Sequence, residues 1–327
     1  MKICCIGDLC GDLLLPYGEV KRHLSGLQRG EIDYSEVIFQ YGGTVGNTCA
    51  VLGKLGARPY FVTDLCGDRN GRFLAEEMQS LGVDLSWSLE NPDKVNMICI
   101  AVIDETGERV MFPWLPPGSD YPEFTRENTS LVPRETMLVF SGGMVMNNDP
   151  ESMDAVCTLT EELKACGSTV VFDLNVRAES YGMNRSRRES YARMIACTDI
   201  LMGSGREEFA AVTGIKDPYE AAEFLCEGKR TVIARDGSKP VMIFSPEGKK
   251  SVPVEQVPVL HTLGAGDSFN GAFLFAYEKG CTIEESAWFA SRIAAHVISF
   301  PGHFSMPGNV SELLESAHMK QNVRMRL

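Results

Sequence analysis

An acidic residue stands at the mouth of a glycine loop in the stretch "HTLGAGDSFNGAF", residues 261–273. Asp267 directly follows Gly264, Ala265 and Gly266. The unpaired amides and the dipole of a helix N-terminus bind anions, and glycine lets the backbone approach a phosphate closely. A carboxylate in the same place can accept a proton from a hydroxyl group. Together these features suit phosphoryl transfer, and the alternative is that Asp267 only caps the helix.

Polar residues also follow two apolar runs that read as buried strands. Asp8 and Asp12 come after "ICCIG", and Asp173, Asn175 and Arg177 come at the end of "VVF". In open α/β sheets, ligands bind beyond the carboxyl ends of the parallel strands. We therefore expect these side chains to gather at one edge of a sheet, together with the glycine loop.

Two other phosphate-binding patterns fail in this chain. The pattern G-x-x-x-x-G-K-[ST] does not occur, which excludes a P-loop enzyme. The segment "GSGREE" begins like a dinucleotide-binding fingerprint, but Glu208 stands at its third glycine position. A carboxylate there would crowd and repel a pyrophosphate, so the pattern counts against nicotinamide binding.

The elements that must position these residues alternate between strands and helices along the chain. Such alternation predicts an α/β fold with a mostly parallel sheet that helices cover on both faces. One helix is predicted over residues 69–82, ending at Gly82, with inward side chains Phe73, Leu74, Met78 and Leu81. A second is predicted to begin at Asp267 and to bury Phe269, Ala272, Phe273 and Ala276. We expect a single α/β domain over residues 1–327.

Two segments interrupt the alternation, at about residues 13–40 and 91–118. The second contains "VNMICIAVIDETGERVMFPW", which predicts a β-hairpin that turns at Glu105–Gly107. Strand pairs inserted in an α/β fold can form a small sheet that covers a site. The alternative is a surface excursion without a role.

Composition limits the class of protein. The 327 residues are 44% hydrophobic and 23% charged, with a formal net charge of −13. This acidic balance counts against a nucleic-acid-binding surface. The 11 cysteines show neither a C-x-x-C pair nor a zinc-site spacing, which favours core thiols in a reducing compartment. Neither a signal peptide nor a membrane-length apolar run is apparent, so we expect a cytoplasmic protein without a membrane partner.

Four motifs in order resemble those of the ribokinase-like, phosphofructokinase-B-type carbohydrate kinase family. They are "QYGGTVGNTCAVLGKLGA", "CGDRNG", "FDLNVR" and "LGAGDSFNGAF". The resemblance runs over nearly the whole chain. It implies a ribokinase-like three-layer sandwich with a small β-sheet lid, formed here by the two inserted segments.

The resemblance also implies roles for individual residues. Asp267 would be the base that deprotonates a sugar hydroxyl, and the amides of Gly264, Ala265, Gly266 and Asp267 would hold the migrating phosphoryl group. Sugar hydroxyls would be held by Asp12, Gly42, Gly43 and Asn47. Asn175, Arg177, Arg235, Gly237 and Ser291 would bind ATP, and Arg177 could instead clamp an acidic group of the substrate. Glu208 would organise Mg²⁺ through water, since magnesium keeps waters and needs few protein ligands.

Three positions depart from the family pattern. Gly205 stands where the family has the Asn of its N-x-x-E motif. His261 stands where an Asp or a similar residue is usual, next to a monovalent-cation site, which counts against potassium activation. Ser291 stands in the adenine-side segment where an Asn is common.

The sequence thus predicts an ATP-dependent sugar kinase, similar to ribokinase, fructokinase and 2-keto-3-deoxygluconate kinase, that forms a homodimer through its lid. Two alternatives stay open. A nucleoside kinase shares the resemblance, and a sugar-binding regulatory protein on the kinase scaffold would explain the departures at Gly205 and His261.

Overall fold

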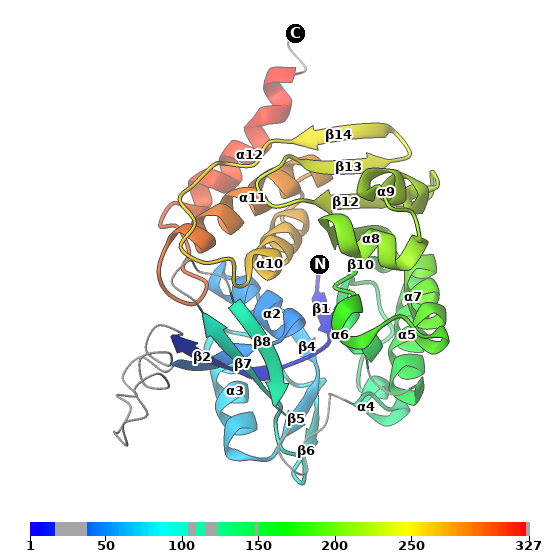
Figure 1. The fold of residues 1–327 in the computed structure, drawn as a ribbon, viewed down its shortest axis with the longest axis vertical. Coiled ribbons are helices and arrows are strands. Elements are labelled where there is room, and N and C mark those ends of the chain that lie inside the picture. The colour runs from blue at the N-terminus through cyan, green and yellow to red at the C-terminus, as the bar shows by residue number, and fades with distance from the viewer. Residues whose placement is uncertain (17–37, 104–108, 115–122, 148–149, 325–327) are drawn as a thin grey trace.

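The computed structural model describes residues 1–16, 38–103, 109–114, 123–147 and 150–324. Its centre is an eight-stranded sheet in the order β14-β13-β12-β11-β10-β9-β1-β4, shown in Figure 1. The strands are β1 (Ile3–Ile6), β4 (Tyr60–Val62), β9 (Leu138–Gly142), β10 (Thr169–Asp173), β11 (Ile200–Ser204), β12 (Thr231–Arg235), β13 (Val241–Ser245) and β14 (Gly248–Val252). The strands from β4 to β12 pair in parallel, and β13 and β14 pair antiparallel.

Helices cover both faces of this sheet, as the alternation of elements predicts. One face carries α2 (Thr44–Lys54), α3 (Arg69–Ser80), α10 (Ala265–Glu278), α11 (Ile283–Ser299) and α12 (Val310–Arg324). The other face carries α4 (Arg126–Ser130), the 3-10 helix η2 (Gly143–Asn147), α5 (Pro150–Ala165), α6 (Ala178–Tyr181), α7 (Arg185–Cys197), α8 (Gly205–Thr213) and α9 (Pro218–Cys226). The three-layer α/β fold is therefore confirmed.

The apolar strand sequences explain why the sheet is central. Every residue of β1 is buried, and successive side chains enter different cores. Cys5 packs into the core on the α2 and α10 side, whereas Cys4 and Ile6 pack into the core on the α5 and α7 side. Near-continuous apolar runs of this kind are typical of parallel strands that helices cover on both faces.

A separate four-stranded sheet stands over the carboxyl ends of the central strands. Its order is β3-β2-β7-β8, formed by β2 (Cys10–Pro16), β3 (Ile38–Gly42), β7 (Ile98–Ile103) and β8 (Arg109–Trp114). The predicted hairpin is confirmed, because β7 and β8 pair antiparallel. Its turn at Glu105–Gly107 lies outside the described residues, as do residues 17–37 and 115–118 of the predicted lid segments. A two-stranded sheet of β5 (Asp64–Cys66) and β6 (Leu89–Asn91) lies beside it.

Side chains of the four-stranded sheet alternate between its two faces. The pairing register aligns Asp12 with Cys99, and Cys99 with Pro113, in one cross-strand row. Cross-strand neighbours share a face, and residues two apart along a strand do as well. Cys10, Asp12, Cys99, Met111 and Pro113 therefore lie on the same face of the sheet.

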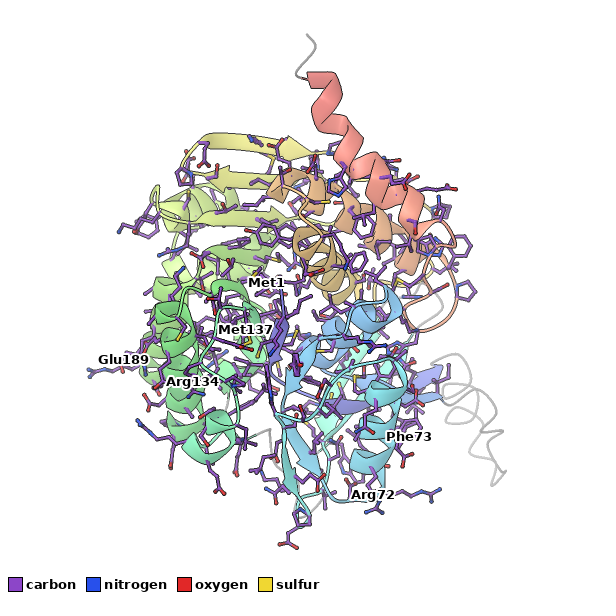
Figure 2. The ribbon with its side chains drawn as sticks, turned by 180° about the vertical axis from the view of Figure 1, so that it is seen from behind. Met1, Arg72, Phe73, Arg134, Met137 and Glu189 are labelled. Atoms are coloured by element: carbon purple, nitrogen blue, oxygen red, sulfur yellow. The ribbon has the colours of Figure 1, made fainter. Side chains whose placement is uncertain are left out.

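The structure corrects one expectation for the helix predicted over residues 69–82. Leu74 and Met78 are buried in α3, but Phe73 is 37% exposed and is wrongly predicted to face inward. Phe73 neighbours Leu74 in the sequence, so it lies about 100° around the helix from the buried stripe. Its ring packs 5.6 Å from the Phe39 ring of β3, at the outer edge seen in Figure 2.

Helix α10 follows the prediction, since Phe269, Ala272, Phe273 and Ala276 are all buried. It packs between α2 and α11. This packing holds the N-terminus of α10 at the carboxyl edge of the central sheet. Across the described part of the chain, the helices are all too short or too polar to cross a bilayer.

Candidate active site

A cavity of about 260 Å³ lies between the carboxyl end of β1, the N-terminus of α10 and the inner face of the four-stranded sheet. It is lined by Asp8, Cys10, Asp12, Gly43, Thr44, Asn47, Met97, Cys99, Met111, Pro113, Met144, Arg177, Tyr181, Leu263, Gly264 and Asp267. Six of the predicted site residues thus meet in one cavity: Asp12, Gly43, Asn47, Arg177, Gly264 and Asp267. The wall combines carboxylates, one guanidinium and an apolar strip of methionines.

Asp267 stands in this cavity as a carboxylate with an unusual proton affinity. Asn47 of α2 donates a hydrogen bond of 2.8 Å from Nδ2 to Asp267 Oδ2. Burial raises the pKa of Asp267 to about 7, helped by the charges of Asp173 and Asp8 and opposed by the Asn47 bond. A carboxylate with a pKa near neutral is suited to accept a proton at physiological pH.

The loop before Asp267 has the conformation that the glycines allow. Gly264 is the N-cap of α10 with φ 73°, in the left-handed region. A Cβ at this position would lie 2.3 Å from the ring of Phe304, so only glycine fits. The first-turn amides of a helix have no acceptor inside the helix. The Ala265 amide donates to Thr262 O at 3.4 Å, whereas the Gly266 amide has no acceptor among the described residues and is available to an anion.

The carboxylate of a residue that follows β1 caps the N-terminus of helix α2. Asp8 follows β1 and accepts hydrogen bonds from the backbone amides of Thr44 and Val45, at 2.9 and 3.2 Å. Burial raises the pKa of Asp8 above its usual range, although these two bonds oppose the shift. The cap fixes the first turn of α2, and one turn later Asn47 reaches Asp267.

Asp12 is held against the turn between β3 and α2. It is 3% exposed and lies directly beside Gly42, where a Cβ would stand 2.2 Å from Asp12 Oδ1. Gly42 therefore stands behind Asp12 rather than in the cavity wall, and its missing side chain lets β3 approach. Cys10, on the same face of β2, contacts Asp12 Oδ1 with its thiol at 3.7 Å.

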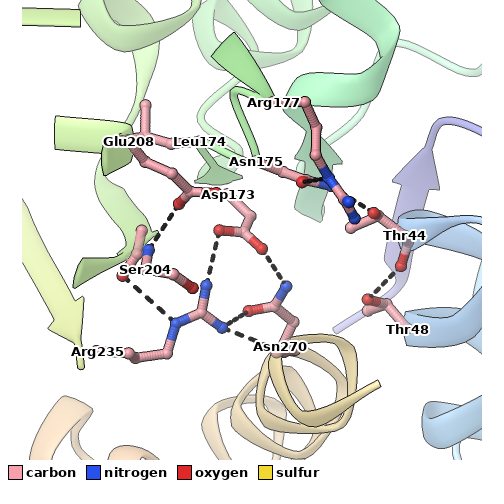
Figure 3. A network of polar contacts seen from close by, with 12 residues as sticks. Thr44, Thr48, Asp173, Leu174, Asn175, Arg177, Ser204, Glu208, Arg235 and Asn270 are labelled. Atoms are coloured by element: carbon pink, nitrogen blue, oxygen red, sulfur yellow. Dashed lines mark hydrogen bonds and ion pairs between the residues drawn. The ribbon is translucent and has the colours of Figure 1, made fainter. Parts of the chain in front are cut away.

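A polar network underlies the glycine loop, as Figure 3 shows. Arg235 donates to Asp173 Oδ1 at 2.8 Å, to Asn270 Oδ1 at 2.8 Å and to the backbone oxygen of Gly266 at 3.1 Å. Asn270 in turn donates to Asp173 Oδ2 at 2.6 Å. The guanidinium thereby ties the ends of β10 and β12 to the first turn of α10.

Two residues after β10 adopt left-handed backbone conformations without being glycine. Asn175 has φ 32° and Arg177 has φ 49°. A non-glycine residue in this conformation destabilises the fold by of order 1–2 kcal/mol, and such residues cluster at functional sites. Arg177 Nε donates to Asn175 Oδ1 at 2.9 Å, and Asn175 Nδ2 donates to Thr44 Oγ1. These bonds turn the Arg177 guanidinium toward the cavity (Figure 3).

Glu208 lies on the other side of the network, near the ends of β11 and β12. Its Oε2 accepts the backbone amide of Ser204 at 2.6 Å. Burial raises the pKa of Glu208 to about 7, and the charge of Asp173 adds to the shift. The hard oxygen donors of the Glu208 carboxylate fit a divalent cation such as Mg²⁺.

The remaining predicted residues lie apart from the cavity. Gly237 is in an exposed turn after β12, and Ser291 is buried in α11, where its hydroxyl donates to the Ala287 oxygen at 2.8 Å. His261 bonds through its backbone amide to Ile298 O at 3.3 Å, and its buried Nδ1 has no partner among the described residues. The nucleotide-binding roles of Asn175, Arg235, Gly237 and Ser291 stay predictions.

Several cavity residues were not in the predicted site. Asp8 carried a signal, since it follows the first strand. Asn270, in the network under the loop, lies one helical turn after Asp267 on the same face. Met144, which the sequence offered either as a lining residue of the sugar site or as core filler, does line the cavity. Met97 and Met111 carried no signal, because methionine fills cores as readily as it lines ligand cavities.

The chain resembles a described family over most of its length. Residues 2–306 match the family model of the pfkB family carbohydrate kinases. Curated relatives include an aminoimidazole riboside kinase of Salmonella typhimurium, 27% identical over 239 residues that cover 73% of this chain and 74% of that protein. A 2-dehydro-3-deoxygluconokinase of Escherichia coli is 25% identical, covering 80% of this chain and 89% of that protein.

Solved structures share the fold. Aminoimidazole riboside kinase from Salmonella enterica, in complex with aminoimidazole riboside and an ATP analogue, superposes with a TM-score of 0.78 at 21% identity. The match covers 96% of this chain and all of that one (100%). The predicted ribokinase-like fold is thereby confirmed.

Proposed function

The chain belongs to the pfkB family of carbohydrate kinases, and we propose that it transfers the γ-phosphoryl group of ATP to a hydroxyl group of a monosaccharide bound in the cavity. The observation that carries the proposal is Asp267, with a pKa of about 7, at the N-terminus of α10 and inside a cavity of sugar size. A hydroxyl acceptor needs such a base, and a transferred phosphoryl group needs such a helix terminus.

The reaction then assigns a task to each group. The substrate hydroxyl oxygen bonds to the γ-phosphorus while the bond to the β–γ bridging oxygen breaks, and the proton passes to Asp267. The first-turn amides of α10 donate hydrogen bonds to the transferred group and stabilise its negative charge. Asn47 holds the carboxylate in place, and Arg235 fixes the loop through Gly266 O.

Sugar hydroxyls are assigned to the carboxylates and backbone at the other end of the cavity. Asp12 accepts, Asn47 can both donate and accept, and Gly43 leaves space for a polyol. The four-stranded sheet supplies this wall, so we propose that it acts as a lid. Because β3 and β8 are its edge strands, with Ile38 and Trp114 about half exposed (51% and 50%), we also propose that the lid is the homodimer interface.

Mg²⁺ is the cofactor that the carboxylates near the nucleotide side fit. Glu208, which lies just after β11, would hold it through water. When bound, the cation neutralises charge on the phosphates of ATP. Gly205 and His261 depart from the family pattern, and comparing rates in potassium and sodium salts tests whether a monovalent cation contributes.

The cavity also narrows the class of sugar. Among the described residues that form its acidic wall, one guanidinium occurs, that of Arg177. An aldonate of the 2-dehydro-3-deoxygluconate type would place its carboxylate there, and its hydroxyls against Asp12 and Asn47. A riboside is the second candidate, because Met97, Met111 and Met144 offer an apolar wall to a heterocyclic base.

A substrate panel tests the proposal. ATP, Mg²⁺ and the purified protein are combined with 2-dehydro-3-deoxygluconate, fructose, ribose, aminoimidazole riboside and adenosine, and ADP release is followed. We expect turnover with one class of these substrates. The substitution Arg177→Met should lower the rate most with an acidic sugar. A folded protein that binds a sugar but releases no ADP with any of these substrates would overturn the kinase proposal. It would favour a sugar-binding regulatory protein instead.

A further inference from the structure

A cysteine, a glutamate and a histidine from separate elements meet where α12 crosses the start of α11. Cys281 lies in the turn between α10 and α11, Glu285 in the first turn of α11, and His318 in α12. The Cys281 sulfur is 3.4 Å from Nε2 and 3.8 Å from Nδ1 of His318. One ligand atom from each of the three side chains lies within 4.8 Å of the others.

The glutamate has one oxygen to spare. Glu285 is 8% exposed, and its Oε2 accepts the backbone amide of Thr282 at 2.8 Å in the capping box of α11. Its Oε1 is buried and has no hydrogen-bond partner within the described residues. A buried carboxylate oxygen left unpaired costs free energy. A cation bound by Oε1 would remove that cost.

The distances suit a tetrahedral zinc ion. Zn–S bonds of about 2.3 Å and Zn–N bonds of about 2.0–2.1 Å at a tetrahedral angle separate sulfur and nitrogen by roughly 3.5 Å. The observed separation of Cys281 Sγ and His318 Nε2 is 3.4 Å. His318 is exposed and Cys281 is buried, so a fourth, water ligand has access from the solvent side.

We propose that Cys281, Glu285 and His318 form a Zn²⁺ site with water as the fourth ligand. These residues are absent from the wall of the catalytic cavity. The ion would join α12 to the turn between α10 and α11, beside the apolar contacts of Leu313, Leu314 and Ala317. Figure 1 shows α12 lying alongside α11, and the cluster joins it to the first turn of α11. This link would anchor a helix that is otherwise packed on one side.

A competing explanation needs no metal. The Cys281 thiol and the His318 ring can form a direct hydrogen bond, which leaves Glu285 Oε1 unpaired. The two explanations differ in what an added metal ion does to the protein, so metal binding separates them.

Cobalt and zinc binding to the full-length, chelator-treated protein tests the site. Co²⁺ bound to a thiolate gives a charge-transfer band in the near ultraviolet, and we expect it to saturate at one equivalent per chain. The band should disappear in Cys281→Ser and in His318→Ala. It should persist in Cys166→Ser, which changes an exposed thiol, and in His296→Ala, which changes a histidine of α11 outside the cluster.

Thermal unfolding gives a second reading. A ligand that binds only the folded state raises Tm, so Zn²⁺ in excess should raise it by several degrees in the wild type and the two controls. His318→Ala should lose this shift, and since its side chain is exposed the variant should fold whether or not Cys281→Ser does. No thiolate band in the wild type, or a band and Tm shift that survive His318→Ala, would overturn the proposal.

Discussion

At the scale of single residues, Asp267 is expected to favour activity at the expense of stability. Asp267→Asn keeps the shape but removes the base, so kcat should fall by about 10²–10⁴-fold while the substrate still binds. An unchanged kcat in steady-state kinetics would rule out its role as base.

The same variant should be more stable than the wild type in alkaline solution. The pKa of Asp267 rises from 3.8 to about 7 on folding, so its stabilising contribution is full below 3.8 and is lost as pH rises through 7. Asp267→Asn has no such charge to bury. Denaturant unfolding should show it to be more stable by about 1–3 kcal/mol at pH 8, with a smaller difference at pH 5. An equal difference at both pH values would contradict the raised pKa.

Substitutions at two neighbours of Asp267 should move the acid limb of the pH profile of kcat/KM in opposite directions. The wild-type value should fall about tenfold per pH unit below pH 7, as the base becomes protonated. Asn47 stabilises the carboxylate and Asp173 destabilises it. Asn47→Ala should therefore move the limb to higher pH, and Asp173→Asn should move it to lower pH. Shifts of the same sign would mean that another group limits the rate.

At the scale of elements, the loop before α10 depends on its packing against Phe304. Gly264→Ala adds a methyl group 2.3 Å from that ring, in a backbone conformation that already disfavours alanine. Gly214→Ala is the matched control, because Gly214 has a similar φ of 78° and nothing within 4 Å of the added Cβ.

Both glycine variants should lose about 1–2 kcal/mol of stability from the backbone. Only Gly264→Ala should also lose kcat, by tenfold or more, because it displaces the amides that hold the phosphoryl group. Denaturant unfolding and steady-state kinetics measure the two effects. Equal kcat values for both variants would mean that the loop tolerates displacement.

At the scale of the whole molecule, the proposed dimer rests on the four-stranded sheet. Trp114→Glu puts a charge on its exposed edge strand and should convert the protein to monomers, because a buried unpaired charge destabilises an interface. Phe224→Glu changes an equally exposed aromatic residue (54%) on α9 and should leave the assembly intact. Analytical ultracentrifugation measures both, and a wild type that sediments as a monomer would contradict the dimer.

The sequence by itself determined the fold class and the position of the glycine loop before Asp267. Both depend on local patterns: apolar runs that alternate with helical periods, and glycines directly before Asp267. The inserted hairpin was equally local, since β7 and β8 are neighbours in the chain. The helix over residues 69–82 was predicted from its period, but Phe73 was assigned to the wrong face, because it lies about 100° around the helix from the buried Leu74.

Only the tertiary structure decided which groups meet. Asn47 bonds to Asp267 across 220 residues of sequence, Asp8 caps a helix 36 residues away, and Arg235 joins Asp173 to the loop of Gly266. Cys281 and His318 meet 37 residues apart, a separation without a recognisable zinc spacing. Parallel strands bring distant carboxyl ends to one edge, and no local pattern specifies which side chains will be neighbours there.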